Sequence, residues 1–187
     1  MIYPDNFIKD EIIGAFIEEK IGDKRIPISA GFELTPFCNL NCIHCYLSPS
    51  RRAKILTNYQ VKRILDILFE NGTLSIFFTG GEVLTRHDFK DIYIYAKKKG
   101  FLVSILTNAT LMSDDIIELF LEYPIEEVSF TMYGKTQETY ESITRVPGSY
   151  QKFIHGMELL HKNKIPCEFK TVGMKQNLHE FLDIVSL

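Results

Sequence analysis

The chain contains 187 residues, of which 45% are hydrophobic and 24% are charged, and it has no tryptophan. This composition is typical of one ordinary globular domain, and a chain of this length buries enough surface to fold without a disulfide framework. Its 21 Lys and Arg residues against 24 Asp and Glu residues give a net charge of −3, which argues against nucleic acid or an anionic membrane as a partner.

The start of the chain carries charges at Lys9, Asp10 and Glu11, where a secretory signal would need an apolar stretch. Nowhere do about 18 consecutive apolar residues occur, so we expect no membrane span. We therefore predict a cytoplasmic protein, in which clustered cysteines bind metal or do chemistry more often than they pair.

From residue 28 onward, β-rich runs alternate with amphipathic segments. Strands are predicted at residues 28–35, 74–79, 101–107, 127–132 and 166–172. Helices are predicted between them and after the last strand: one begins at a capping box of Thr57 and Gln60, and the others begin at Thr85, after Ser113, after Gly148 and at Asn177. This alternation predicts βαβ units in an α/β fold with parallel strands. Residues 1–26 stand outside the repeat and are predicted to form an N-terminal extension.

Three of the four cysteines, Cys38, Cys42 and Cys45, lie within one short stretch just after the first predicted strand. Ligands bind at this end of the strands in parallel α/β folds. A structural zinc site would need a fourth ligand, and His44 lies too close to Cys45 to supply one easily. Three thiolates on one loop instead favour an iron–sulfur cluster with one iron left without a protein ligand. A structural zinc protein remains the weaker alternative.

The spacing of these cysteines, with residues 33–36 before them and Tyr46 after them, resembles the signature of the radical S-adenosylmethionine (radical SAM) enzymes. His44 stands where that family usually has an aromatic residue. The resemblance implies that the three thiolates ligate a [4Fe–4S] cluster, whose open iron chelates S-adenosylmethionine, with His44 and Tyr46 beside the cofactor. It also implies that one electron cleaves the cofactor to methionine and a 5′-deoxyadenosyl radical, which abstracts a hydrogen atom.

Gly80, Gly81 and Glu82 follow the second predicted strand. By itself this is a turn that uses the conformational freedom of glycine, with an acidic residue near a helix N-terminus. It also resembles the family's Gly-Gly-Glu motif, whose backbone and carboxylate hold the methionyl ammonium of the cofactor. The resemblance therefore assigns these residues to cofactor binding, with Gly81 allowing close approach of the backbone.

Polar residues near the ends of the third and fourth strands, Asn108, Ser129 and Thr131, allow two interpretations. They can form local hydrogen bonds. By resemblance to the family they contact the ribose and carboxylate of the cofactor. Arg145 is either a solvated arginine or a further contact to that carboxylate. Cys167, on the fifth predicted strand, is expected to be a buried thiol and no cluster ligand.

The resemblance implies a partial (βα) barrel with about five of the usual six strand–helix units, so residues 27–187 are expected to be a core domain that is incomplete at its C-terminus. Residues 130–160 most resemble the SPASM-type subgroup, which implies a peptide or small protein as substrate. A reducing electron donor such as a flavodoxin or ferredoxin, and a missing C-terminal half, are the other implied partners. The alternative is a truncated, non-catalytic module that binds the cluster and S-adenosylmethionine.

Overall fold

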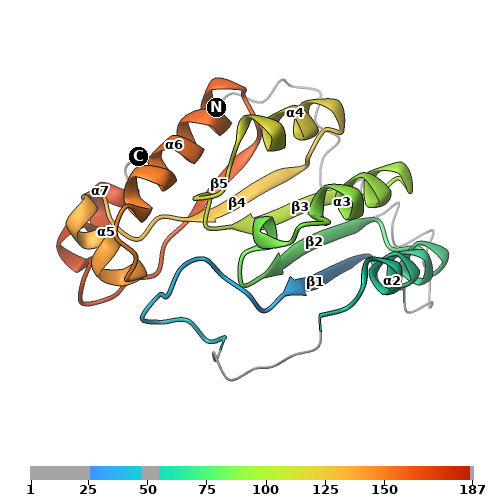
Figure 1. Cartoon of the computed structure of the whole chain (residues 1–187), viewed down its shortest axis with the longest axis horizontal. Coiled ribbons are helices and arrows are strands. Elements are labelled where there is room, and N and C mark those ends of the chain that lie inside the picture. Colours follow the sequence, from blue (N-terminus) through green and yellow to red (C-terminus); the bar gives the residue numbers. More distant parts are fainter. Residues whose placement is uncertain (1–25, 48–54, 186–187) are drawn as a thin grey trace, which may run out of the picture.

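The computed structural model describes residues 26–47 and 55–185 (Figure 1). One sheet contains five parallel strands in the order β1-β2-β3-β4-β5. The strands are β1 (Ser29–Thr35), β2 (Ser75–Gly80), β3 (Leu102–Thr107), β4 (Glu127–Thr131) and β5 (Cys167–Lys170). All five lie where the sequence predicts them, although β5 is shorter, and the α/β fold with parallel strands is confirmed.

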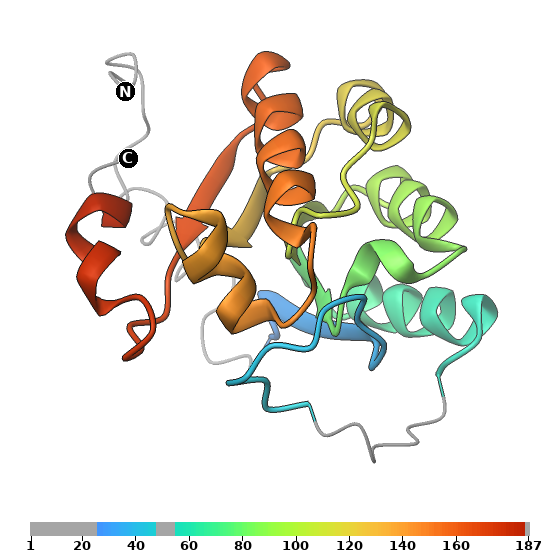
Figure 2. The ribbon, with the colours of Figure 1, turned by 60° about the vertical axis from the view of Figure 1, so that its left-hand side comes forward.

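Four helices cover one face of the curved sheet, as Figures 1 and 2 show: α2 (Asn58–Glu70), α3 (Phe89–Lys98), α4 (Asp114–Glu122) and α6 (Ser149–Lys162). The shorter α5 (Gln137–Thr144) and α7 (Phe181–Val185) lie near the end to which the strands point. Two 3₁₀ helices, η1 (Val83–Thr85) and η2 (Leu178–Glu180), precede α3 and α7. None of the helices in the described residues is long and apolar enough to cross a membrane.

The hydrophobic core lies between the sheet and these helices. Alternate residues of neighbouring strands are buried, among them Phe78 and Ile105, because successive strand side chains point to opposite faces. Phe130 of β4 is fully buried, with its ring 5.8 Å from that of Phe153 of α6 and 4.7 Å from that of Phe169 of β5. This packing leaves the other face of the sheet free for polar side chains.

Two helix starts show how local capping was predicted well in one case and poorly in the other. The capping box of α2 is confirmed, since Thr57 and Gln60 exchange side-chain and backbone hydrogen bonds. Thr85 is not the start of the second helix, because it ends η1 and α3 begins only after Asp88. The Glu82 carboxylate accepts a hydrogen bond from the Leu84 amide and caps η1 instead.

One helix was missed by the sequence analysis, one expectation is wrong, and one concerns residues that are mostly not described. Helix α5 was not predicted. Cys167 is exposed on β5 at the edge of the sheet, so the expectation of a buried thiol is wrong. The predicted N-terminal extension, residues 1–26, lies almost entirely outside the described residues.

Candidate functional site

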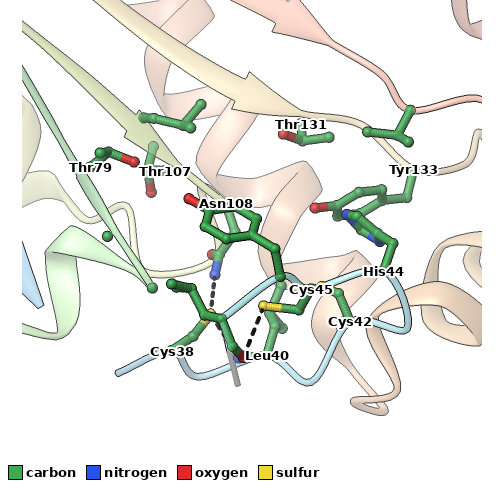
Figure 3. Close-up of a pocket in the computed structure, with 16 residues that line it drawn as sticks. Cys38, Leu40, Cys42, His44, Cys45, Thr79, Thr107, Asn108, Thr131 and Tyr133 are labelled. Atoms are coloured by element: carbon green, nitrogen blue, oxygen red, sulfur yellow. Dashed lines mark hydrogen bonds between the residues drawn. The ribbon is translucent and has the colours of Figure 1, made fainter. Parts of the chain in front are cut away.

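A cavity of about 300 Å³ opens where the strands end (Figure 3). The loop after β1, residues 36–47, here called the cysteine loop, forms one wall, and the ends of β2, β3 and β4 form the others. Nine predicted site residues line it: Cys38, Cys42, His44, Cys45, Tyr46, Gly80, Gly81, Asn108 and Thr131. The parallel sheet brings these residues together because the carboxyl ends of all its strands meet at one edge.

The three cysteine thiols lie on the same loop but have different neighbours. The Cys38 sulfur accepts hydrogen bonds from the Leu40 amide, at 3.4 Å, and from the Asn108 side chain, at 3.7 Å. The Cys45 thiol donates to the Leu47 carbonyl at 3.8 Å. Burial raises the pKa of Cys42 to about 11, and a hydrogen bond with the Tyr133 hydroxyl opposes this rise.

An all-thiol donor set suits iron, and its three members line one cavity. In the described residues, however, no three His, Cys, Asp or Glu side chains are already gathered as a group that could hold a metal ion. The sulfur atoms would therefore have to turn toward one another before they could ligate a cluster together.

The cysteine loop is held in place by helix α5. The Asn41 amide donates to the Thr144 carbonyl and the Ile43 amide donates to the Ile143 carbonyl, both at 3.0 Å. These two carbonyls belong to the last residues of α5, where helix carbonyls lack partners within the helix. The helix that was not predicted thus supplies the hydrogen bonds that fix the middle of the loop.

The Gly-Gly-Glu turn touches the beginning of the cysteine loop. The Gly81 amide donates to Thr35 and the Glu82 amide donates to Phe37, each at 2.7 Å. A side-chain Cβ at Gly81 would lie only 2.1 Å from the Phe37 carbonyl oxygen. Within the protein, the glycine therefore makes room for the loop that carries the cysteines.

Glu82 is fully buried behind the turn and does not line the cavity. Its carboxylate accepts hydrogen bonds from the Leu84 amide at 3.0 Å, the Thr107 hydroxyl at 2.7 Å and the Asn108 amide at 2.6 Å. Burial raises the pKa of this carboxyl, and the three hydrogen bonds oppose the rise. Glu82 thus joins the turn after β2 to the end of β3.

Two other predicted residues also lie away from the cavity lining. Ser129 is buried and bonds to the Glu127 and Glu168 carboxylates, at 2.8 and 3.2 Å. Arg145 is exposed directly after α5, in a left-handed backbone conformation with φ of 58°. The structure therefore does not bring these two side chains to the cavity.

Tyr133 is a lining residue that the sequence analysis did not single out. Its ring lies 5.0 Å from the His44 ring (Figure 3), and its interaction with Cys42 lowers the pKa of that thiol. Burial lowers the pKa of His44, which favours the neutral imidazole. A sequence signal existed, since Tyr133 lies two residues after Thr131, just beyond the end of the same strand.

Residues 32–187 match the Radical SAM superfamily, and the chain belongs to this family. It is 33% identical to an AdoMet-dependent heme synthase of Methanosarcina barkeri over 156 residues, which are 82% of this chain and 45% of that protein. It is also 33% identical to the antilisterial bacteriocin subtilosin biosynthesis protein AlbA of Bacillus subtilis, over 85% of this chain and 36% of that protein. The chain thus spans less than half the length of these relatives.

Solved structures show the same fold. SuiB of Streptococcus suis bound to S-adenosylmethionine has a TM-score of 0.76 and 19% identity, covering 90% of this chain and 39% of SuiB. SuiB bound to the precursor peptide SuiA has a TM-score of 0.75 and 20% identity, covering 99% of this chain and 44% of SuiB. The family match confirms the resemblance read from the cysteine and glycine motifs, and the family is one of enzymes that use a [4Fe–4S] cluster and S-adenosylmethionine.

Proposed function

We propose that this chain is the part of a radical SAM enzyme that binds the cluster and S-adenosylmethionine, with a peptide or small protein as substrate. The observation that carries the proposal is that Cys38, Cys42 and Cys45 line the same cavity as the Gly80–Gly81 turn. Residues 27–187 are the core domain in this proposal, and the rest of the barrel and the substrate site are supplied by further polypeptide.

When bound, the cluster and S-adenosylmethionine supply a 5′-deoxyadenosyl radical that abstracts a hydrogen atom from the substrate. The protein's part is to hold three thiolates on one loop and to present polar groups of Asn108 and Thr131 from neighbouring strand ends. The His44 and Tyr133 rings, 5.0 Å apart, form an adjoining wall of the cavity. Contacts of Glu82, Ser129 and Arg145 with the cofactor stay predictions, because none of them lines the cavity.

Two relatives support a peptide substrate: one is named for the biosynthesis of a bacteriocin, and one structure contains a precursor peptide. The heme synthase is equally similar in sequence and favours a heme precursor as a second candidate substrate. A flavodoxin or ferredoxin as electron donor and a cytoplasmic location complete the proposal.

The first test is anaerobic reconstitution of the purified chain with iron and sulfide, followed by reduction with S-adenosylmethionine present. We expect bound iron and sulfide and release of 5′-deoxyadenosine. Cys42→Ala removes a ligand and should abolish cluster binding. Cys167→Ala is the matched control, because that thiol is exposed on β5 and does not line the cavity, and it should leave iron content unchanged.

Other outcomes decide between the alternatives. Equal loss of iron in Cys42→Ala and Cys167→Ala would contradict the ligand assignment. Zinc without sulfide would favour a structural zinc protein, and a cluster that never yields 5′-deoxyadenosine would favour the non-catalytic module. Supplying candidate peptides or a heme precursor to the chain together with the further polypeptide proposed above then separates the two substrate classes.

A further inference from the structure

Arg86 is a buried arginine that lies outside the cavity and has no part in the function proposed above. It directly follows η1, and only 5% of its side chain is exposed to solvent. Arginine is almost never buried this deeply unless its charge and its N–H groups find partners. The partners of Arg86 therefore indicate what the side chain is for.

The Arg86 guanidinium binds two separate stretches of backbone. Its Nη1 donates to the Leu34 carbonyl at 2.7 Å, and its Nη2 donates to the Leu56 carbonyl at 2.8 Å. Asp88 balances the charge in a two-pronged pair, with Nε to Oδ1 at 2.6 Å and Nη2 to Oδ2 at 3.0 Å. The hydrogen bond from Arg86 lowers the pKa of the Asp88 carboxyl, which keeps it ionised.

Leu34 precedes the cysteine loop in the chain and Leu56 follows it. The Arg86 side chain therefore binds the backbone at both ends of the stretch between Leu34 and Leu56, here called the cysteine segment. The Gly-Gly-Glu turn binds the beginning of this segment too, because the Gly81 amide donates to the Thr35 carbonyl and the Glu82 amide donates to the Phe37 carbonyl. Closing a loop costs conformational entropy. Because Arg86 already holds Leu34 and Leu56 near each other, ordering the cysteine loop costs less entropy.

We propose that Arg86 is a positioning residue that ties the two ends of the cysteine segment together in the metal-free protein, so that the loop is already in place when the cluster binds. The role of the tie in preparing the loop for the cluster rests on the proposed function, whereas the hydrogen bonds that make the tie do not. Lysine cannot replace arginine here, because a single ammonium lacks the planar fork that reaches two carbonyls and a carboxylate together.

The test is hydrogen exchange of the metal-free 187-residue chain carrying Arg86→Lys. We expect three amides to exchange at least tenfold faster. The Asn41 and Ile43 amides belong to the cysteine loop and donate to α5, and the Glu82 amide donates to Phe37 in that loop. Amides of the central strand β3 should keep their wild-type rates. Arg63→Lys is the matched control, since Arg63 is exposed on α2 and, among the described residues, forms an ion pair with Asp66 at a long 3.7 Å.

Two results would overturn the proposal. The first is wild-type exchange of the loop amides in Arg86→Lys, and the second is an equal acceleration throughout the sheet, which would make the role one of general stability. If Arg86→Lys does not fold, the double variant Arg86→Met with Asp88→Asn removes both charges together and is measured in the same way.

A second readout connects the tie to the cluster. At limiting iron, Arg86→Lys should bind several-fold less iron and sulfide than wild type, and excess iron should restore the content. Iron uptake equal to wild type at limiting iron would refute the assigned purpose. If wild-type protein takes up no cluster at all, the proposed function fails, while the exchange experiment still decides whether Arg86 ties the loop.

Discussion

Replacing Gly81 by alanine should displace the cysteine loop, because the added methyl group has no space. An ideal Cβ at this position would lie 2.1 Å from the Phe37 carbonyl oxygen, 2.4 Å from the Phe37 carbonyl carbon and 2.9 Å from the Pro36 oxygen. All three are backbone atoms, so no side-chain rotation relieves the overlap. The start of the loop must move by about 1 Å or more to reach an ordinary contact distance.

The cost can be worked out from the contacts that this shift disturbs. The Gly81 amide donates a 2.7 Å hydrogen bond to Thr35 at the end of β1, and the Glu82 amide donates one of the same length to Phe37 in the cysteine loop. Each bond contributes about 0.5–1.5 kcal/mol to stability. Overpacking of a close contact costs a further 1–3 kcal/mol or so. We therefore expect Gly81→Ala to lower the free energy of unfolding by about 2–6 kcal/mol.

Urea denaturation of the metal-free chain, followed by circular dichroism, measures this change, and iron uptake on reconstitution should fall with it. Gly31→Ala on β1 is the matched control, because the nearest atom to its Cβ in the described residues would be a Phe77 ring carbon at 3.9 Å. Alanine in a strand should there be neutral or stabilising by up to about 1 kcal/mol. Equal stability of the two variants, with equal iron uptake, would refute the reasoning.

Two further predictions concern parts of the fold that support the site. Burial raises the pKa of the Glu180 carboxyl, but hydrogen bonds from Thr136, Thr139 and backbone amides outweigh this effect and bring the pKa to about 2. Glu180→Gln should therefore lower the free energy of unfolding by about 1.5–3 kcal/mol at pH 7. In urea titrations this difference should shrink as the pH falls from 4.5 toward 2, since wild-type Glu180 then becomes protonated; a difference independent of pH would contradict the assignment. Phe130→Ala should cost about 3–5 kcal/mol by the same measurement, whereas Leu121→Ala, at a side chain 55% exposed, should cost far less; similar losses would argue against the core described.

The sequence by itself determined the order and type of most elements and the main parts of the site. Strand and helix periodicity located all five strands, because their side chains alternate between a buried and an open face. The capping box at Thr57 was readable because its hydrogen bonds join residues three positions apart. The spacing of the three cysteines and the Gly-Gly-Glu turn were equally local, and together they placed the chain in its family.

Tertiary structure alone decided features whose partners are distant in the chain. Helix α5 has few apolar residues, and Glu180 stabilises its start from more than forty residues away by binding Thr136 and Thr139. The tie made by Arg86 joins backbone carbonyls, which carry no side-chain pattern that a sequence could display.

The sequence likewise could not show which contacts require Glu82 and Gly81 at their positions. Local spacing identified the turn, but the burial of the Glu82 carboxylate against Thr107 and the approach of Phe37 to Gly81 depend on how β1, β2 and β3 lie side by side. Periodicity reports which face of an element is buried, and capping reports where it starts. Neither reports which distant backbone atom fills the space beside it, because that is set only when the sheet assembles.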